Sequence, residues 1–386
     1  MKPLSRTVLL GALVLAAVNL RPGITSLAPL IERIADELSL SRMFISLTTA
    51  LPVLCMGLLA PLAPRLALRL GLERTITLCL MGVVLALALR LAGHNSTLLV
   101  GSAVLMGTAI ALAGPLLSGF IKRHFTGQMG QVVGWYSLSM AVGGAAGVVL
   151  TVPVTTLFAG DWSMGLAFWA LPAAAAVLVW WRLPTQPETV ASHEGRGLPW
   201  REPRAWLIST LFATQAGLFY ALATWCVARY HEAGLTLMHA NTLFSLSMLM
   251  GLPSAFLLPW LVQRFGNRYR LLTACAALTC ISLVMITGWP TVWPQLWALT
   301  LGFGLSGSFS LSLVLPLYEA DSPLAVSRWT AMMLFMGYSF GSLTPVLSGL
   351  ARDMAGNYQV PFMVLTGLAL LLCVLAWWLG RTARRA

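Results

Sequence analysis

Long apolar runs recur from one end of the chain to the other, separated by short polar segments. About 20 apolar residues suffice to cross the hydrocarbon core of a bilayer as an α-helix. Only 9% of the 386 residues are charged, whereas soluble domains carry about 25%. The sequence therefore predicts an all-α, multi-pass membrane protein and excludes a water-facing globular domain.

Twelve such runs can be placed, and a hydrophilic segment separates the first six from the last six. They cover residues 7–31, 43–68, 74–92, 97–121, 130–158, 163–182, 205–229, 240–264, 269–289, 293–318, 325–349 and 360–380. The separating segment is rich in proline, glycine and charge, which is typical of a linker. We predict an N-terminal six-helix bundle (1–183), a cytoplasmic linker (184–203) and a C-terminal six-helix bundle (204–386).

The placement of basic residues predicts the orientation in the membrane. If both termini lie inside, most of the 24 lysine and arginine residues fall in cytoplasmic loops, as they ordinarily do. We therefore expect a protein of the inner (cytoplasmic) membrane with both termini in the cytoplasm. The same distribution accounts for the net charge of +12 without a nucleic-acid partner. The first run is too long for a signal peptide, so we expect it to be retained as a helix.

Two loops share an internal repeat. It is carried by residues at a constant offset after the second and eighth runs: Pro64, Arg69, Gly71 and Pro259, Arg264, Gly266. A repeat of this kind, with a linker at its centre, favours two parallel six-helix halves.

In the first of these loops the chain resembles the major facilitator superfamily of secondary transporters, and the resemblance extends over essentially its whole length. The superfamily's pattern Gly-x-x-x-Asp-Arg-x-Gly-x-Arg is matched at Arg69, Gly71 and Arg74, with Leu68 where the acid belongs. The resemblance implies two pseudo-symmetric bundles, alternating access around a central cavity, and a gating role for these loops.

The second copy of the pattern keeps Arg264 and Gly266 and has Gln263 at the acidic position. We expect Glu73 or Gln263 to replace the missing acids only in part.

More specifically, the chain resembles the cyanate and 2-nitroimidazole transporter branch of that superfamily. The resemblance rests on Asn-Leu-Arg-Pro at 19–22, Ile-Lys-Arg-His-Phe at 121–125, Gly-Trp-Tyr-Ser at 134–137 and Gly-Gly at 143–144. The branch usually has a proline shortly before its Ile-Lys-Arg, where this chain has Ser118. The resemblance implies a carrier of a small anionic or polar solute, such as a cyanate-like anion, a nitroimidazole or a small carboxylate.

Arg21 is the strongest candidate for contact with such a solute. It lies inside the first apolar run, where an arginine costs at least ~2.5–3.5 kcal/mol. Pro22 and Gly23 follow directly and can open the helix, which membranes tolerate only where protein or a cavity covers the backbone. We expect Arg21 to bind solute, with help from Asn19, Thr25 and Ser26. The alternative is an arginine that snorkels to the outer interface.

Further candidates for the binding site are polar or aromatic residues of later runs: Ser118, Tyr136, Met140, Gln215, Phe219, Tyr220 and Ser306. For Ser306, which lies in a stretch of small residues, close helix packing is the competing interpretation. For Gln215 the competing interpretation is a hydrogen bond that joins two helices. The aromatic residues and Met140 are equally compatible with plain core packing.

The acidic residues all fall in predicted loops or at helix ends. Facilitated transport, anion exchange or proton entry on the solute is therefore more natural than a proton relay on the protein. The sequence has no enzyme signature, and its six cysteines show no metal-ligand spacing, so we expect no catalytic residue, cofactor, metal or disulfide.

The expected partners are a small-molecule solute and the lipid bilayer, with a monomer as the functional unit. The alternatives are a proton-linked drug or metabolite exporter of the same fold and a membrane sensor without flux.

Overall fold

The computed structural model describes residues 5–40, 42–92, 95–184 and 197–382. Within these ranges the structure is helical and contains no β-strand. Twelve helical segments there are long and apolar enough to cross a membrane: Arg6–Leu30, Ala50–Leu70, Leu72–Ala92, Ser96–His124, Met129–Leu157, Trp162–Trp181, Pro203–Glu232, Leu237–Phe265, Arg268–Gly288, Pro294–Glu319, Pro323–Ala355 and Gln359–Thr382. The predicted all-α, twelve-span fold is confirmed.

Three of the twelve spans are interrupted. The first consists of α1 (Arg6–Asn19), α2 (Pro22–Thr25) and η1 (Ala28–Leu30), and α3 (Ile31–Glu37) follows it. The second consists of the part of α4 (Arg42–Leu58) from Ala50 onward, η2 (Ala60–Leu62) and α5 (Ala63–Leu70). The sixth consists of α9 (Trp162–Ala167) and α10 (Ala170–Trp181). Prolines at the start of α2, within η2 and at the start of α5 lack the N–H that a continuous helix needs, which explains the first two interruptions.

The other spans are continuous apart from one terminal 3-10 turn. They are α6 (Leu72–Leu89) with η3 (Arg90–Ala92), α7 (Ser96–His124), α8 (Met129–Leu157), α11 (Pro203–Glu232), α12 (Leu237–Phe265), α13 (Arg268–Gly288), α14 (Pro294–Glu319), α15 (Pro323–Ala355) and α16 (Gln359–Thr382).

Polar caps mark where several helices begin. The side chains of Asn95, Asp161 and Thr236 accept hydrogen bonds from the first backbone N–H groups of α7, α9 and α12.

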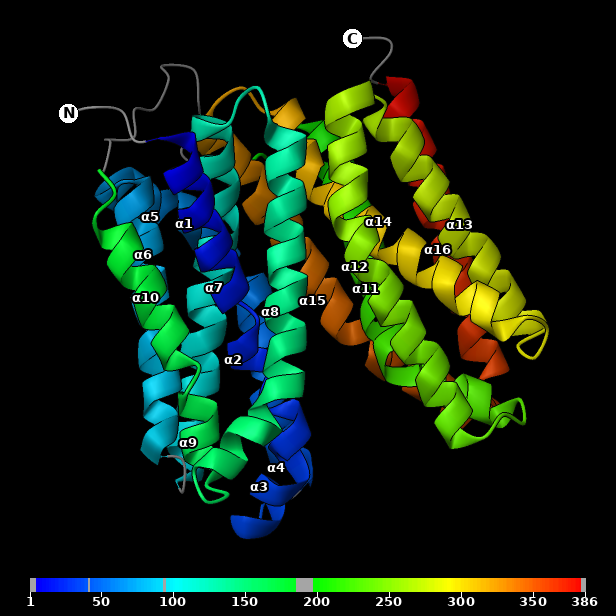
Figure 1. The fold of residues 1–386 in the computed structure, drawn as a ribbon. Helices are drawn as coiled ribbons and strands as arrows, with labels where there is room; N and C mark the ends of the chain where they lie inside the picture. The colour runs from blue at the N-terminus through cyan, green and yellow to red at the C-terminus, as the bar shows by residue number, and fades with distance from the viewer. Residues whose placement is uncertain (1–4, 41, 93–94, 185–196, 383–386) are drawn as a thin grey trace. The chain divides into compact units, whose positions relative to one another are not determined.

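The chain divides into two compact units (Figure 1). The first comprises residues 1–127, 135–198 and 319–335, and the second comprises 128–134, 199–318 and 336–386. One of the five boundaries between them follows residue 198, inside the predicted linker, but positions 185–196 of that linker lie outside the described residues. The start of α8 therefore belongs to the second unit and the start of α15 to the first.

In the first unit α7 packs against α4 and α6, and α10 packs against α6 and α1. Trp180 of α10 is buried, and its indole N–H donates to the carbonyl of Ala12 in α1 at 2.8 Å. Its ring also packs on Phe120 of α7, with centroids 4.9 Å apart. Trp180 thus joins three helices of the first unit.

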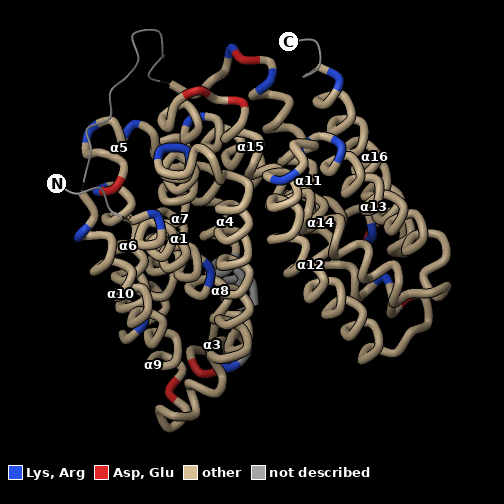
Figure 2. Tube along the Cα trace, turned by 45° about the horizontal axis from the view of Figure 1, so that its top comes forward, with Lys and Arg blue, Asp and Glu red and all other residues tan. Residues whose placement is uncertain are grey.

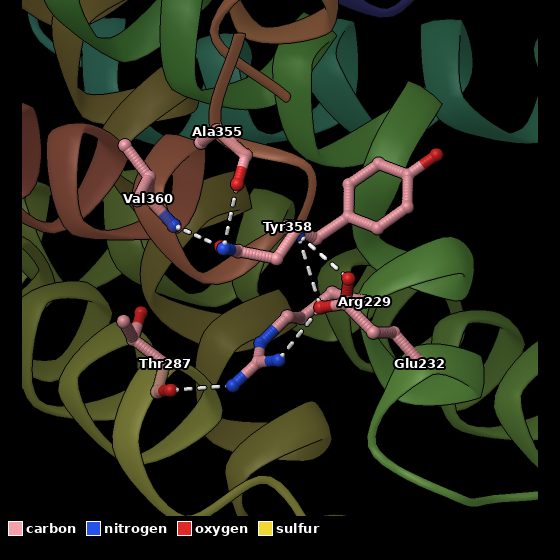
Figure 3. A network of polar contacts seen from close by, with 7 residues as sticks. Arg229, Glu232, Thr287, Ala355, Tyr358 and Val360 are labelled. Atoms are coloured by element: carbon pink, nitrogen blue, oxygen red, sulfur yellow. Dashed lines mark hydrogen bonds and ion pairs between the residues drawn. The ribbon is translucent and has the colours of Figure 1, made fainter. Parts of the chain in front are cut away.

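In the second unit α16 packs against α13 and α11, and a polar network holds one end of this group together (Figure 3). The carboxylate of Glu232 accepts from the backbone N–H of Tyr358 at 2.8 and 3.0 Å and pairs with Arg229 at 3.0 Å. Arg229 also donates to the carbonyl of Thr287 at 2.6 Å. The network ties the end of α11 to the end of α13 and to the turn before α16.

Charge and hydropathy follow the pattern of a membrane protein. Figure 2 shows that the charged residues gather mostly at the ends of the helices. Large apolar side chains are exposed along the helices, among them Leu157 (81%), Leu171 (65%) and Val346 (68%). Since lipid tails solvate such side chains and water does not, these surfaces suit a bilayer.

Candidate functional site

The first span is broken at Arg21. Helix α1 ends at Asn19. Arg21 occupies the N-cap position of α2, and Pro22 is the first residue of α2. Because Pro22 has no N–H, the carbonyl of Val18 loses the donor that an unbroken helix would supply. The carbonyl of Arg21 accepts from the N–H groups of Ile24 and Thr25, each at 3.0 Å, and so restarts the helix. The side chain of Arg21 is half-buried at this break.

Two glycines of α8 let the broken segment approach closely. A β-carbon on Gly143 would lie 2.1 Å from the carbonyl oxygen of Val18. A β-carbon on Gly147 would lie 2.3 Å from the hydroxyl of Thr25 and 2.9 Å from the Cα of Pro22. No side chain fits at either position, so α8 and the first span touch backbone to backbone.

The glycine between them lies against Arg21 itself. A β-carbon on Gly144 would meet the Cβ of Arg21 at 3.6 Å, which is ordinary contact distance. The hydroxyl of Thr25 donates to the carbonyl of Gly144 at 2.9 Å, with the carbonyl of Arg21 also within reach at 3.2 Å. Thr25 thus fixes the break to α8, and its single proton is already used.

The two other polar residues predicted near Arg21 differ in their contacts. Asn19 is buried, and its amide nitrogen donates back to the carbonyl of Leu15 in α1 at 2.8 Å. Ser26 is fully buried, and its hydroxyl forms no hydrogen bond with any described residue. Asn19 therefore stabilises the end of α1, while Ser26 keeps its hydroxyl for water or a solute.

Tyr136 and Met140 lie on the face of α8 that carries the glycines. Their spacing from Gly143 and Gly144 places all four on one side of the helix. Both side chains are buried, at 5% and 8% exposure. Along the helix axis, Met140 lies about 6 Å before Gly144, and Tyr136 lies about 12 Å before Gly144. Tyr136 and Met140 thus lie on the face of α8 whose glycines pack against the break at Arg21.

Ser118 of α7 is not brought to this break. The helix contacts the break through Met106, whose side chain occupies the space a β-carbon on Gly23 would need. Ser118 lies twelve residues further along α7, about 18 Å away. It is buried and lies 3.4 Å from the carbonyl of Gly114 in its own helix.

A second group of predicted residues lies on α11 in the second unit. Gln215 is 1% exposed, and its amide nitrogen donates to the carbonyl of Leu305 in α14 at 3.2 Å. Its amide oxygen is buried and accepts no hydrogen bond from any described residue. A buried acceptor without a partner costs about 1–3 kcal/mol. Gln215 therefore offers one open acceptor.

Phe219 and Tyr220 begin a series of touching aromatic rings. Their centroids lie 5.4 Å apart, Tyr220 lies 6.4 Å from Tyr338, and Tyr338 lies 6.1 Å from Phe212. Phe212 in turn lies 5.9 Å from Phe309 of α14. Sequence reasoning missed Phe212, although it stands three residues before Gln215 and so shares its helix face.

Ser306 has a packing role. Its hydroxyl donates to the carbonyl of Gly251 in α12 at 2.8 Å. One turn earlier, a β-carbon on Gly302 would lie 1.9 Å from the carbonyl oxygen of Ser247. These contacts match the helix-packing alternative for this stretch of small residues.

In the first candidate gating loop the arginines are exposed and the glutamate is buried. Gly71, at φ 86°, forms the turn between α5 and α6, and Arg69 and Arg74 beside it are exposed. Glu73 is 2% exposed and pairs with Arg123 at the end of α7, 2.9 Å away. His124 approaches the same carboxylate at 3.5 Å. Glu73 therefore links the first candidate gating loop to the Ile-Lys-Arg-His segment, a pairing that the sequence did not reveal.

The second candidate gating loop uses a neutral amide. Gly266, at φ 67°, ends α12, and Arg264 is exposed. The amide oxygen of Gln263 accepts from the N–H of Gly130 at 3.1 Å and from the hydroxyl of Tyr318 at 3.3 Å. Gln263 thus joins the start of α8 and the end of α14 to α12 within the second unit.

Comparison with known proteins gives one consistent family. The family model described as Major Facilitator Superfamily matches residues 13–342. The cyanate transport protein of Escherichia coli K12 is 31% identical over 353 residues, 91% of each chain. The 2-nitroimidazole transporter of the same organism is 28% identical over 382 residues, 98% of this chain and 96% of that protein. The solved fucose:proton symporter of E. coli superposes with a TM-score of 0.79 at 14% identity, covering 97% of this chain and 98% of the other.

Proposed function

The chain belongs to the major facilitator superfamily, and on that premise we propose that it carries a small anionic or polar solute across the cytoplasmic membrane by alternating access. It is a multi-pass membrane transporter and not an enzyme. The proposal concerns the solute, the site and the mechanism.

The proposal is based on the break in the first span at Arg21. A guanidinium inside a membrane span strongly favours an anion or an oxygen-rich polar group beside it, because little water is present to screen the charge. The span Arg6–Leu30 contains no aspartate or glutamate. The close approach of the α8 glycines and the hydrogen bond from Thr25 to Gly144 hold the break in place. Arg21 is therefore the group that we assign to solute recognition.

The names of the relatives suggest a solute chemistry. Cyanate is an anion, and a nitroimidazole presents two nitro oxygens on a flat ring. A guanidinium can donate two parallel hydrogen bonds to such acceptors. Tyr136 and Met140, on the same face of α8 as Gly144, supply an apolar and aromatic surface for a small flat molecule.

Gln215, Phe219 and Tyr220 are proposed to contact the solute as well. The open amide oxygen of Gln215 suits a donor group such as a ring N–H. We propose no protein-borne proton relay, because the acidic residues in the described spans stand in first or last turns. The proton, where one is moved, travels on the solute.

Ligand-induced thermal stabilisation tests the proposal. Purified protein would be heated with cyanate, 2-nitroimidazole or acetate, each over a range of concentrations. We expect a saturable rise in melting temperature for the wild type. In Arg21→Gln the apparent affinity should fall about 10–100-fold, the loss expected for a hydrogen bond to a charged group. Arg65→Gln, which removes an exposed arginine of α5, should bind as the wild type does.

Flux is tested separately. In proteoliposomes, the solute that stabilises the protein should enter or leave faster than in protein-free vesicles. Equal affinity in the wild type and Arg21→Gln would move the site to Gln215 and its aromatic neighbours. Binding without flux would indicate a sensor.

A further inference from the structure

A groove in the second unit lies outside the proposed solute site. It has a volume of about 860 Å³ and is formed by the turn after α12, the first turns of α13 and the last turns of α16. Its lining includes Arg268, Arg270 and Arg381 together with the aromatic residues Tyr269 and Trp377, and none of the described residues that line it is acidic. We call these five residues the arginine groove.

Two of the three arginines of the arginine groove stack on its aromatic rings. Arg268 lies over the ring of Tyr269, 4.6 Å from its centroid, and Arg381 lies over the ring of Trp377 at 4.0 Å. The hydroxyl of Tyr269 accepts from both Arg204 and Arg268, at 3.0 and 3.1 Å. An anion bound in the groove would be attracted by several guanidinium groups at once.

The walls of the groove continue as exposed apolar helix faces. On α13, the positions that follow Arg270 on the same face are Ala277 in the groove and then Ile281 and Val284, which are 52% and 42% exposed. On α16, Trp377 precedes Arg381 by one turn, and Val374 and Leu370 extend the same face, 51% and 57% exposed. A ligand held at the arginines would therefore have an apolar surface directly below it.

This combination distinguishes a lipid from a free phosphate. The arginines stand at the ends of two membrane spans, where lipid headgroups lie, and the apolar faces run toward the bilayer centre. A free phosphate would use only the arginines, whereas a phospholipid would also use the apolar faces. Basic pockets between membrane helices recognise anionic headgroups in this way.

We propose that the arginine groove binds the headgroup of an anionic phospholipid from the adjacent leaflet, with the acyl chains along α13 and α16. This inference requires the membrane-spanning fold and is independent of the solute proposed above.

Lipid titration of the full-length protein in mild detergent tests this proposal. Dioleoyl-phosphatidylglycerol should raise the melting temperature saturably, and zwitterionic dioleoyl-phosphatidylcholine should do so with at least about tenfold weaker apparent affinity. Sodium phosphate and glycerol 3-phosphate serve as headgroup probes without acyl chains. Saturation by either probe at the same concentration as the lipid would indicate a free phosphate site and overturn the proposal.

Two sets of variants identify the site. Arg270→Gln with Arg381→Gln should weaken phosphatidylglycerol binding at least about tenfold. Arg6→Gln with Arg65→Gln, which removes the same charge from exposed arginines of the first unit, should leave it unchanged. Equal losses in the two pairs would mean a diffuse charge effect and contradict the proposal.

A fluorescence measurement tests the site without the charge variants. Phosphatidylglycerol brominated near the headgroup quenches nearby tryptophan fluorescence, and Trp377 lines the groove. Quenching should decrease in Trp377→Phe and remain unchanged in Trp181→Phe, which replaces an exposed tryptophan of α10. Equal quenching in both variants would place the lipid elsewhere.

Discussion

The carbonyl oxygen of Val18 points at Gly143, so closely that a β-carbon on this glycine would lie 2.1 Å from it. This carbonyl is the one that Pro22 deprives of its helical donor. The break in the first span is thus placed against the glycine face of α8, and the next glycine along, Gly144, lies beside Arg21.

Gly143→Ala should therefore disturb the break, whereas Gly144→Ala should not. The first change forces the two backbones apart and should destabilise the protein by about 1–3 kcal/mol. The second introduces a β-carbon at ordinary contact distance, 3.6 Å, and should be neutral or stabilising by up to about 1 kcal/mol. Thermal unfolding and solute titration of both variants check this. Equal behaviour would mean that the contact with Val18 is not needed.

Gln215→Met should separate binding from stability. The change removes a hydrogen bond to Leu305 worth about 1 kcal/mol, but it also removes a buried oxygen without a partner, which costs about 1–3 kcal/mol. We expect the melting temperature to stay within a few degrees of wild type while solute affinity falls. A melting temperature that drops steeply, with affinity retained, would show a purely structural glutamine.

Glu73→Gln should destabilise the protein. It leaves the guanidinium of Arg123, 12% exposed, without its carboxylate partner. Breaking a fully buried pair costs about 3–5 kcal/mol, and partial exposure reduces this to about 2–3 kcal/mol. The matched control is Asp353→Asn, which breaks the exposed pair with Arg352 and should cost less than about 1 kcal/mol. Unfolding measurements on both variants, with the double-mutant cycle Glu73→Gln and Arg123→Met, isolate the pair.

Glu232→Gln should loosen the turn before α16. The carboxylate accepts from the backbone of Tyr358 and pairs with Arg229, which is nearly buried (Figure 3). The amide keeps one acceptor oxygen, so we expect a loss of about 1–2 kcal/mol. Hydrogen exchange should show faster exchange of the Tyr358 amide. Unchanged exchange would mean that the network does not hold the turn.

The fold was predictable because membrane spans are specified by length and hydropathy, which a sequence displays directly. All twelve spans and the superfamily resemblance followed from the apolar runs and from the loop residues Arg69 and Gly71. The interruption at Arg21 was indicated by Pro22 and Gly23. The contact of this interruption with Gly143 was not indicated, because the sequence does not show which helices pack against each other.

The polar contacts were harder to predict for the same reason. Glu73 and Arg123 are separated by 50 residues, and their pairing depends on how α6 packs against α7. The bonds that use the hydroxyl of Thr25 and the amide nitrogen of Asn19 require atomic positions. The roles of Arg21, Gln215 and the gating loops in transport stay predictions.

The amide of Gln263 has a consequence for how the protein responds to acidity. At this position the superfamily pattern has a carboxylate, whose bonds to neighbouring donors weaken when it takes up a proton. An amide has no proton equilibrium in the physiological range, and the ordinary pKa of a tyrosine hydroxyl is about 10. The contacts of Gln263 with Gly130 and Tyr318 therefore keep the same strength in acidic and neutral surroundings. The carrier retains this junction when the pH on either side of the membrane changes.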